Sequence, residues 1–416
     1  MISQKIREHI QRTNTTLYEN NLYPPSVIIC GPTTEPMINV GGKDMIGFCS
    51  GNYLGFAKDP EILEEMHKAV EKYGITASGS RLVCGTQDVH IELENTIASW
   101  QGTEDAVTFF LVTVTSAGVL AGIFDGQLTP LITEITRQNP NFGKVEVFTD
   151  QYTHPTAIDA CTLAKVELKK FKHSSMRHLE KKLMESDANT KIIQTDGVFS
   201  APGEIANLPG LVALAEKYQA SLFVDDAHGT GVLGETGRGI WQHFNIQPDK
   251  VDFKIGSLAK AFAGGLGGFI ACDKDLAEYL RVNARHYMFG GSIPPGHARA
   301  ITVAIQKFLK EPWRRQQLMK NANYLRTRLA EKGFYTFNSQ AQIVPILIGD
   351  EIMAIKVVDE LKEMGIFTAC FRFPAAPKGK AILRINVTCL HQDSHIDFLV
   401  DSLSAIAEKH TISRAA

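Results

Sequence analysis

Short apolar segments alternate with amphipathic helical segments along most of this chain, and this alternation restricts its possible folds more than any other feature. Apolar residues recur at helical spacing in 61–73 and again in 208–218. The segments that read as short buried strands are 106–112, 145–150, 191–197, 221–226 and 251–257. Strands that alternate with helices predict an α/β fold with a mostly parallel central sheet.

The pattern divides the chain into three predicted regions. Residues 1–57 form an N-terminal arm, in which we expect a helix over 1–22 and a strand pair around 36–48. Residues 58–297 form a large α/β domain. Residues 298–416 form a smaller α+β domain, because the regular alternation stops there.

Within the smaller domain, the pattern predicts four elements. We expect a long helix over 298–329 and strands near 342–349 and 382–388. A further helix separates these two strands, and a final helix is expected over 393–408.

The composition is that of an ordinary globular protein. Hydrophobic residues make up 44% of the 416 residues, and 43 Lys and Arg against 45 Asp and Glu leave a net charge of -2. This balance argues against a nucleic-acid partner, which requires a broad basic surface, but it permits a small anionic ligand. The seven cysteines are scattered without a CxxC pair, so we expect no disulfide framework, no metal site and a reducing cytoplasmic location.

One uncharged run requires a membrane check. Residues 106–124 carry no charge over 19 positions, but they include several Thr, Ser and Gly residues. No excess of Lys and Arg flanks the run closely, as it would beside a membrane span. We therefore expect a buried strand that leads into a buried helix, and no membrane span.

Reactive side chains follow three of the predicted strands. Asp225 and His228 come after one strand, Lys260 after the next, and Asp150 and His154 after a third. In a doubly wound sheet, ligands bind beyond the carboxyl ends of the strands. These clusters are therefore expected to converge on one edge of the sheet.

Lys260 is the only charged residue between Ile255 and Ala271. It could be a surface lysine on a loop, but its apolar surroundings favour a partly buried amine that forms a Schiff base. Asp225 could cap a helix, or it could pair with the pyridine nitrogen of pyridoxal phosphate (PLP). His228 and His154 could be structural, or they could bind the phenolic oxygen and stack on the ring of the same cofactor.

A possible nucleotide motif occurs in the same region. Residues 229–234 match GxGxxG, and Asp252 lies about twenty residues further on. A dinucleotide site requires a helix that begins at these glycines, whereas 234–239 adds more glycines and opposes a helix. The acidic residues before Gly229 would also repel a pyrophosphate, so this alternative is disfavoured.

These residues and their surroundings resemble the α-oxoamine synthase family of fold-type I PLP enzymes. The resemblance extends over about 45–400 and is specific because many short segments occur in the same order. Those segments are 50–57, 77–94, 153–159, 197–209, 223–239, 256–268, 288–295 and 382–388.

The resemblance implies a role for each residue of the central cluster. Lys260 is the Schiff-base lysine and the acid/base at the substrate α-carbon, and Asp225 pairs with the pyridine nitrogen. His228 bonds the phenolic oxygen of the cofactor, and His154 stacks on its ring. Residues 58–297 are then the large PLP-binding domain.

The resemblance also implies residues for the cofactor oxygens and for the substrate. Ser200 supports the oxygen side of the cofactor, Ser257 contacts its phosphate, and Arg384 binds the substrate carboxylate. The phosphate turn falls at 111–116, where we expect backbone N–H groups near Val112 and the hydroxyl of Thr113 to help.

The sequence departs from the family pattern at several positions. The usual Ser-Gly-aromatic turn is replaced at 111–116, and about ten extra residues follow near 127–143. The single-residue departures are Gly51, Ala259, Gly290, Gly291 and Ile382. Segments 257–262 and 370–387 also resemble the bacterial α-hydroxyketone autoinducer synthases. A divergent member with altered substrate choice is therefore expected.

The function implied is the decarboxylative condensation of an amino acid with an acyl-CoA, which yields an α-aminoketone, CoA and carbon dioxide. The family also implies a homodimer with active sites at the subunit interface. Other PLP chemistry on the same fold, either transamination or amino-acid decarboxylation, remains the alternative. A catalytically inactive partner subunit is disfavoured because Lys260, Asp225 and His228 are intact.

Overall fold

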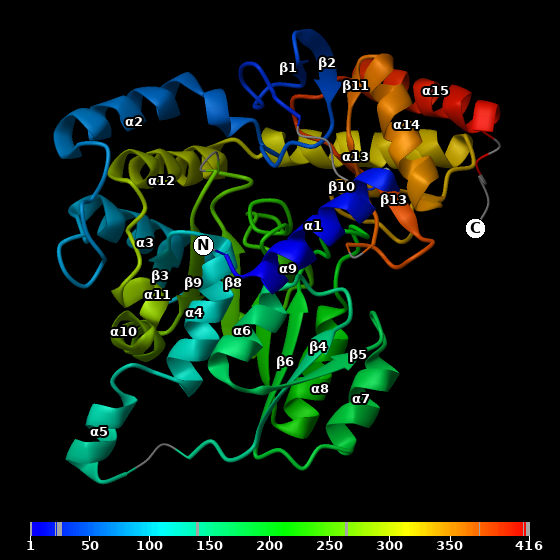
Figure 1. Ribbon diagram of the computed structural model, residues 1–416. Coiled ribbons are helices and arrows are strands. Elements are labelled where there is room, and N and C mark those ends of the chain that lie inside the picture. Colours follow the sequence, from blue (N-terminus) through cyan, green and yellow to red (C-terminus); the bar gives the residue numbers. More distant parts are fainter. Residues whose placement is uncertain are drawn as a thin grey trace.

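The computed structural model describes residues 2–20, 22, 27–138, 141–262, 265–373, 375–410 and 412. Within these residues, a seven-stranded sheet forms the centre of the molecule (Figure 1). Its strands in spatial order are β3 (Asp105–Phe109), β9 (Gly268–Cys272), β8 (Phe253–Ser257), β7 (Ser221–Asp225), β6 (Thr190–Asp196), β4 (Val145–Asp150) and β5 (Glu167–Phe171). Strand β9 runs antiparallel to both neighbours, and the remaining pairs are parallel. The predicted mostly parallel α/β sheet is confirmed.

Two strands of this sheet escaped the sequence analysis for different reasons. Strand β5 lies at the sheet edge with only Phe171 buried, so it has no apolar run. Strand β9 is fully buried, but it follows β8 without an intervening helix and begins within a glycine-rich segment. A prediction that requires apolar strands to alternate with helices therefore cannot find either strand.

Helices cover both faces of the central sheet, and the strand residues alternate between two apolar layers. Leu222 and Val224 of β7 belong to one layer and Phe223 to the other, as the two-residue period of a strand requires. One layer is packed by α3 (Asp88–Gln101), α7 (Met176–Met184), α8 (Leu208–Tyr218) and α12 (Pro295–Lys310). The other is packed by α4 (Val112–Phe124), α6 (Thr156–Ala164), α10 (Lys274–Asn283) and α11 (Arg285–Met288). Burial on both faces explains why the strands read as continuous apolar runs.

The ends of the chain meet in two small sheets. Strands β1 (Met37–Val40) and β2 (Lys43–Gly47) form the predicted hairpin, and β2 also pairs with β11 (Ile366–Phe367). The C-terminal sheet has the order β10 (Ile343–Gly349), β13 (Ala381–Asn386) and β12 (Ala369–Phe371). The remaining helices are α1 (Gln4–Glu19), α2 (Pro60–Tyr73), α5 (Thr129–Thr136), α9 (Ile240–His243), α13 (Trp313–Glu331), α14 (Glu351–Glu363) and α15 (Asp393–His410).

The prediction of one long helix over 298–329 is wrong. Helix α12 ends at Lys310, and α13 begins at Trp313 after Glu311 and Pro312. Proline has no N–H to continue the helical ladder, and its ring clashes with the preceding turn. The apolar spacing continues across the break, which is why the pattern alone joined the two helices.

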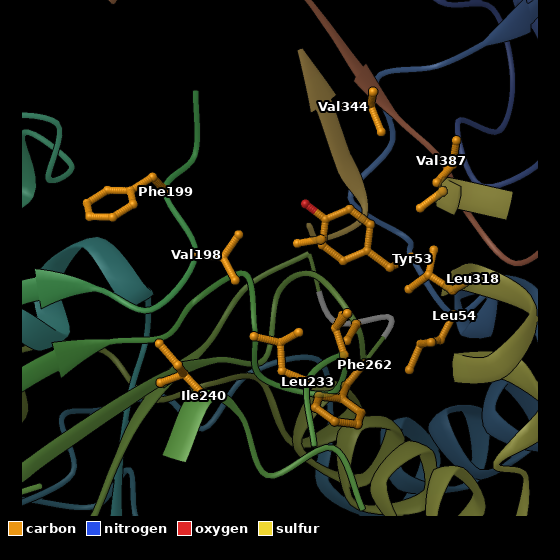
Figure 2. Close-up of a cluster of buried hydrophobic side chains, with 14 of the residues drawn as sticks. Tyr53, Leu54, Val198, Phe199, Leu233, Ile240, Phe262, Leu318, Val344 and Val387 are labelled. Atoms are coloured by element: carbon orange, nitrogen blue, oxygen red, sulfur yellow. The ribbon is translucent and has the colours of Figure 1, made fainter. Parts of the chain in front are cut away.

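The apolar core continues from the central sheet into the C-terminal sheet. In Figure 2, Val198, Phe199 and Leu233 lie on one side of Tyr53, and Val344 and Val387 on the other. All of these residues belong to one buried cluster. The division of the chain at 57 and 297 therefore stays a prediction, because no break in the packing marks it.

The uncharged run at 106–124 forms β3 and α4, as expected. Among the residues described, no helix combines the length and the apolar character that a membrane span requires. The extra residues that follow include α5, which projects from the body of the molecule (Figure 1).

Gly229, the first glycine of the possible nucleotide motif, packs against a buried carboxylate together with two glycines outside the motif. A Cβ atom on Gly197, Gly229 or Gly239 would lie 2.1, 2.1 or 2.2 Å from an oxygen of Asp226. The carboxylate accepts a hydrogen bond from the Ile240 amide at 2.7 Å, and burial raises its pKa to about 8. No helix begins at residues 229–234, since the next one starts at Ile240. The geometry that a dinucleotide site requires is therefore missing there.

A second, partly buried polar cluster joins the end of β4 to the loops that follow β5 and β6. His173 Nδ1 lies 2.8 Å from Asp150 Oδ1, and its Nε2 lies 3.0 Å from Glu204 Oε2. Burial alone would lower the pKa of His173, but the two carboxylates raise it to about 9. The protonated ring contacts Tyr152 in a tilted arrangement, with ring centroids 4.4 Å apart and an interplanar angle of 32°. This ion triad holds together two loops that reach the site described below.

The His173 pKa predicts how stability changes with pH. Its folded pKa lies above the unfolded value of about 6.5, a difference of about 3 kcal/mol. This contribution is fully present below about pH 6.5 and is lost as the pH rises through about 9. We expect the urea midpoint of the wild type to fall over this range, and that of His173→Gln to fall less. His67→Gln, on the exposed face of α2, is the control, and equal slopes for wild type and His173→Gln would contradict the assignment.

Candidate active site

A cavity of about 1010 Å³ opens at the carboxyl ends of β4, β6 and β7, beside the start of α4 and below the C-terminal sheet. Most residues predicted from the sequence line it. They are Val112, Thr113, His154, Ser200, Asp225, His228, Lys260 and Arg384. The three strand-end clusters thus converge on one edge of the sheet, because parallel strands end at the same edge.

Ser257 is the predicted site residue that does not line this cavity. Its side chain is fully buried, and its hydroxyl accepts a hydrogen bond from the Ala259 amide at 3.2 Å. The hydroxyl therefore stabilises the turn that leads to Lys260.

Lys260 and Asp225 form the electrostatic centre of the cavity. Burial lowers the pKa of the Lys260 amine, while the charge of Asp225 opposes this shift. Burial raises the pKa of Asp225, and Lys260 again opposes the shift. The carboxylate accepts hydrogen bonds from Ser116 Oγ at 3.3 Å and from the Ala227 amide at 3.2 Å. This arrangement combines a buried amine with a carboxylate in a fixed orientation.

His228 is held in the buried wall of the cavity by two contacts. Its Nδ1 lies 2.8 Å from the Tyr53 hydroxyl, and its carbonyl accepts a hydrogen bond from Gln342 Nε2 at 2.8 Å. Burial, with the charges of Lys260 and Arg384, lowers its pKa well below 6.5, so the ring is neutral at pH 7. Tyr53 lies in the 50–57 segment, but nothing in the sequence pattern linked it to His228.

His154 differs from His228 in being exposed at the cavity wall. Its Nδ1 lies 2.9 Å from the Thr156 hydroxyl, and its amide donates to the carboxylate of Asp196 at 3.2 and 3.3 Å. The loop geometry therefore depends on Asp196.

Asp196 lines the cavity and was missed by the sequence analysis. It ends β6 and lies in register with Asp225 at the end of β7. Burial and the charge of Asp225 raise its pKa well above its usual value. The signal was present, since 191–196 is also an apolar strand that ends in an acid, as the segment before Asp225 does.

The start of α4 offers backbone donors to the cavity. Leu111 precedes the helix, and its apolar side chain cannot accept a hydrogen bond from the first N–H groups of α4. Strand β9 passes so close that a Cβ on Gly268 would lie 2.5 Å from Val112 Cα. An uncapped helix start is a ready site for a phosphate group.

Arg384 enters the cavity from β13. Its Nε donates to Asn386 Oδ1 at 3.2 Å, and its guanidinium carbon lies 4.9 Å from the centre of the Phe371 ring. Within the described residues, Arg384 forms no ion pair with an acidic side chain, so its charge is available to a ligand carboxylate. Gly51, one of the departures from the family pattern, lies beside the lysine stem, since a Cβ there would be 3.8 Å from Lys260 Cγ.

This donor set fits PLP. The cofactor requires an amine for covalent attachment, a carboxylate for its ring nitrogen, and donors for its phenolic oxygen and phosphate. Lys260, Asp225, His228 and the start of α4 supply these groups around one cavity. In the described part of the chain, no group of three or more His, Cys, Asp or Glu residues is arranged to hold a metal ion.

Comparison with known proteins agrees with this geometry. The family model for aminotransferase class I and II matches residues 43–403. The chain is 36% identical to 8-amino-7-oxononanoate synthase of Symbiobacterium thermophilum, over 94% of this chain and 95% of that protein. It is also 36% identical to 8-amino-7-oxononanoate synthase 1 of Bacillus subtilis, over 90% and 91% of the two chains.

Solved structures agree as well. The serine palmitoyltransferase of Sphingomonas wittichii matches with a TM-score of 0.87 and 26% identity over 99% of both chains. A structure of SPT with PLP matches with a TM-score of 0.88 and 26% identity, over 99% and 100% of the two chains. The chain therefore belongs to the aminotransferase class I and II family and, within it, to the PLP-dependent α-oxoamine synthases.

Proposed function

We propose that this chain condenses an amino acid with an acyl-CoA and releases CoA and carbon dioxide, leaving an α-aminoketone. The observation that carries the proposal is that a partly buried amine, a partly buried carboxylate and a guanidinium line one cavity, and that the guanidinium has no ion pair among the described residues. When bound, PLP supplies a ring that accepts electrons from the amino-acid α-carbon. The named relatives, 8-amino-7-oxononanoate synthase and serine palmitoyltransferase, support this reaction class.

Lys260 is proposed to hold the cofactor and to move the proton at the α-carbon. An amine can accept a proton only in its neutral form. Burial lowers the pKa of Lys260 and so favours that neutral form. The same amine can return the proton after the carboxylate is lost.

Asp225 and His228 are proposed to bind the ring of the cofactor. Because burial raises the Asp225 pKa, the carboxylate needs a cationic partner to remain ionised, and a protonated ring nitrogen is such a partner. Ser116 and the Ala227 amide keep its orientation. The neutral His228 then bonds the phenolic oxygen, and the exposed ring of His154 stacks on the cofactor face.

The remaining oxygen contacts are assigned to three places. The first N–H groups of α4, at Val112 and Thr113, bind the phosphate. Ser200, which lines the cavity, bonds on the phenolic-oxygen side. Arg384 binds the amino-acid carboxylate and orients the bond that breaks.

The reaction is tested by supplying the PLP-loaded enzyme with amino acids and acyl-CoAs of graded length while free thiol is measured. We expect thiol release only when both substrates are present, together with carbon dioxide. Lys260→Ala should abolish release, whereas Lys254→Met should retain it. Lys254 is the matched control because its Nζ donates to the Pro248 and Val251 carbonyls, away from the cavity. Carbon dioxide or a keto acid formed without an acyl-CoA would instead indicate a decarboxylase or an aminotransferase.

Arg384 provides a second kinetic prediction. Arg384→Ala removes charge-assisted hydrogen bonds to the carboxylate, and we expect the KM for the amino acid to rise about a hundredfold, or about 3 kcal/mol. The KM for the acyl-CoA should stay within about twofold. Arg384→Lys keeps the positive charge but loses the paired N–H donors of the guanidinium. Its KM for the amino acid should therefore lie between those of the wild type and Arg384→Ala. An unchanged amino-acid KM in Arg384→Ala would refute the assignment.

A homodimer is proposed from apolar side chains that are exposed on the surface of the single chain. The loop that carries Leu82 and Val83 is bridged through Ser80 to Gly291, next to Phe289. Val83 is 81% exposed and Phe289 70% exposed. Helix α1 adds two exposed isoleucines, Ile6 and Ile10, and Ile2 is exposed just before the helix begins. A second copy of the chain would cover such surfaces.

Sedimentation equilibrium tests the dimer. We expect the mass of two chains for the wild type and dissociation for Val83→Glu, because the new charge would be buried. A monomeric wild type would disprove this proposal but not the reaction. We further propose a reducing cytoplasmic location, which the free state of all seven cysteines supports.

A further inference from the structure

Tyr53 is fixed in the core directly behind the cavity wall that holds His228. Its side chain is 1% exposed and belongs to the buried cluster drawn in Figure 2. Its amide donates a hydrogen bond to the Gly51 carbonyl at 2.8 Å, and its carbonyl accepts one from the Cys389 amide at 2.8 Å. The backbone and the ring are therefore held in place, and the proposed function assigns no role to the hydroxyl.

The two ring nitrogens of His228 have different surroundings. Nδ1 lies 2.8 Å from the Tyr53 hydroxyl, whereas Nε2 forms no hydrogen bond within the described residues. The two rings are tilted by 45° with centroids 6.2 Å apart, so they meet through their polar atoms rather than by stacking. Because His228 also lines the cavity, Nε2 is the nitrogen that can serve a ligand there. The neutral ring carries one proton, and the position of this proton decides whether Nε2 donates or accepts.

The surroundings of the Tyr53 hydroxyl decide the direction of its hydrogen bond to Nδ1. Burial raises the pKa of Tyr53, while the charge of Arg384 and hydrogen bonding by the Gln342 and Arg384 side chains oppose the shift. A guanidinium has only donors, and the amide nitrogen of Gln342 donates in this region to the His228 carbonyl at 2.8 Å. The hydroxyl oxygen therefore faces donors on this side, and its own hydrogen is directed to the acceptor, His228 Nδ1.

We propose that Tyr53 is a positioning residue: its hydroxyl donates a hydrogen bond to His228 Nδ1 and so keeps the single proton of the ring on Nε2. In this tautomer, Nε2 is a donor, which a negatively charged phenolic oxygen of PLP requires. The opposite tautomer would present a lone pair to that oxygen and repel it. This assignment rests on the proposed function and adds a residue that acts through His228 rather than on the cofactor itself.

NMR of the PLP-free protein, isotope-labelled at the histidine nitrogens, tests the tautomer without any turnover. The His228 signals are identified by their loss in His228→Gln. We expect the wild-type proton on Nε2. In Tyr53→Phe, we expect the two nitrogen shifts to move toward each other as the second tautomer becomes populated.

Tyr279→Phe is the matched control, because the Tyr279 hydroxyl donates to the Ile123 carbonyl at 3.5 Å, away from the cavity. Its His228 shifts should equal those of the wild type. A wild-type proton on Nδ1, or identical His228 shifts in wild type and Tyr53→Phe, would overturn the assignment.

The visible absorption band of bound PLP gives a second readout. A hydrogen bond donated to the phenolic oxygen weakens the hold of that oxygen on the proton of the nitrogen that joins PLP to Lys260. A weaker donor therefore raises the pH at which this proton is lost. We expect the titration midpoint of Tyr53→Phe to lie about half a pH unit above that of the wild type. In a His228→Gln background, Tyr53→Phe should cause no further change, and a further change of equal size would contradict an action through His228.

Turnover separates this assignment from the proposed function. With saturating substrates, we expect kcat of Tyr53→Phe to fall about fivefold, while the KM for acyl-CoA stays within about twofold. The expected NMR and absorption changes in a protein that releases no thiol would support the role of Tyr53 and refute the proposed function. Thiol release with unchanged NMR and absorption in Tyr53→Phe would do the reverse.

Discussion

The burial of opposite charges at the carboxyl ends of parallel strands is the constraint on which the rest of this structure depends. Strands β6 and β7 end in register at Asp196 and Asp225, and Lys260 follows the next strand. A buried charge is costly unless it is paired or becomes neutral. Burial lowers the pKa of the Lys260 amine and raises that of the Asp225 carboxyl, and the charge of each group opposes the shift of the other.

Packing around the site serves this electrostatic arrangement. The glycines at 197, 229 and 239 leave space for the Asp226 carboxylate directly behind the cavity. The Asp150–His173–Glu204 triad joins the loops that carry Tyr152 and Ser200. Both features use buried ionisable groups to position backbone. This explains why a glycine-rich segment that resembles a nucleotide motif has a different role here.

The sequence predicted the residues of the cavity floor better than those of its walls. Lys260, Asp225 and His228 follow apolar strands, so a local pattern shows them. Asp196 follows the same pattern, and it was missed only because the rule was not applied to its strand. Phe371 lines the cavity and Tyr53 contacts His228, and only packing brings these distant segments there. No local pattern reports such a contact.

By itself, the sequence determined the α/β class, most of the strands and the cluster of reactive residues at one edge of the sheet. It could do so because strand burial and strand polarity appear in short stretches of residues. Only the tertiary structure decided the place of the antiparallel β9 and the contact between Tyr53 and His228. These properties depend on which distant groups meet, and that information is absent from any single segment of the chain.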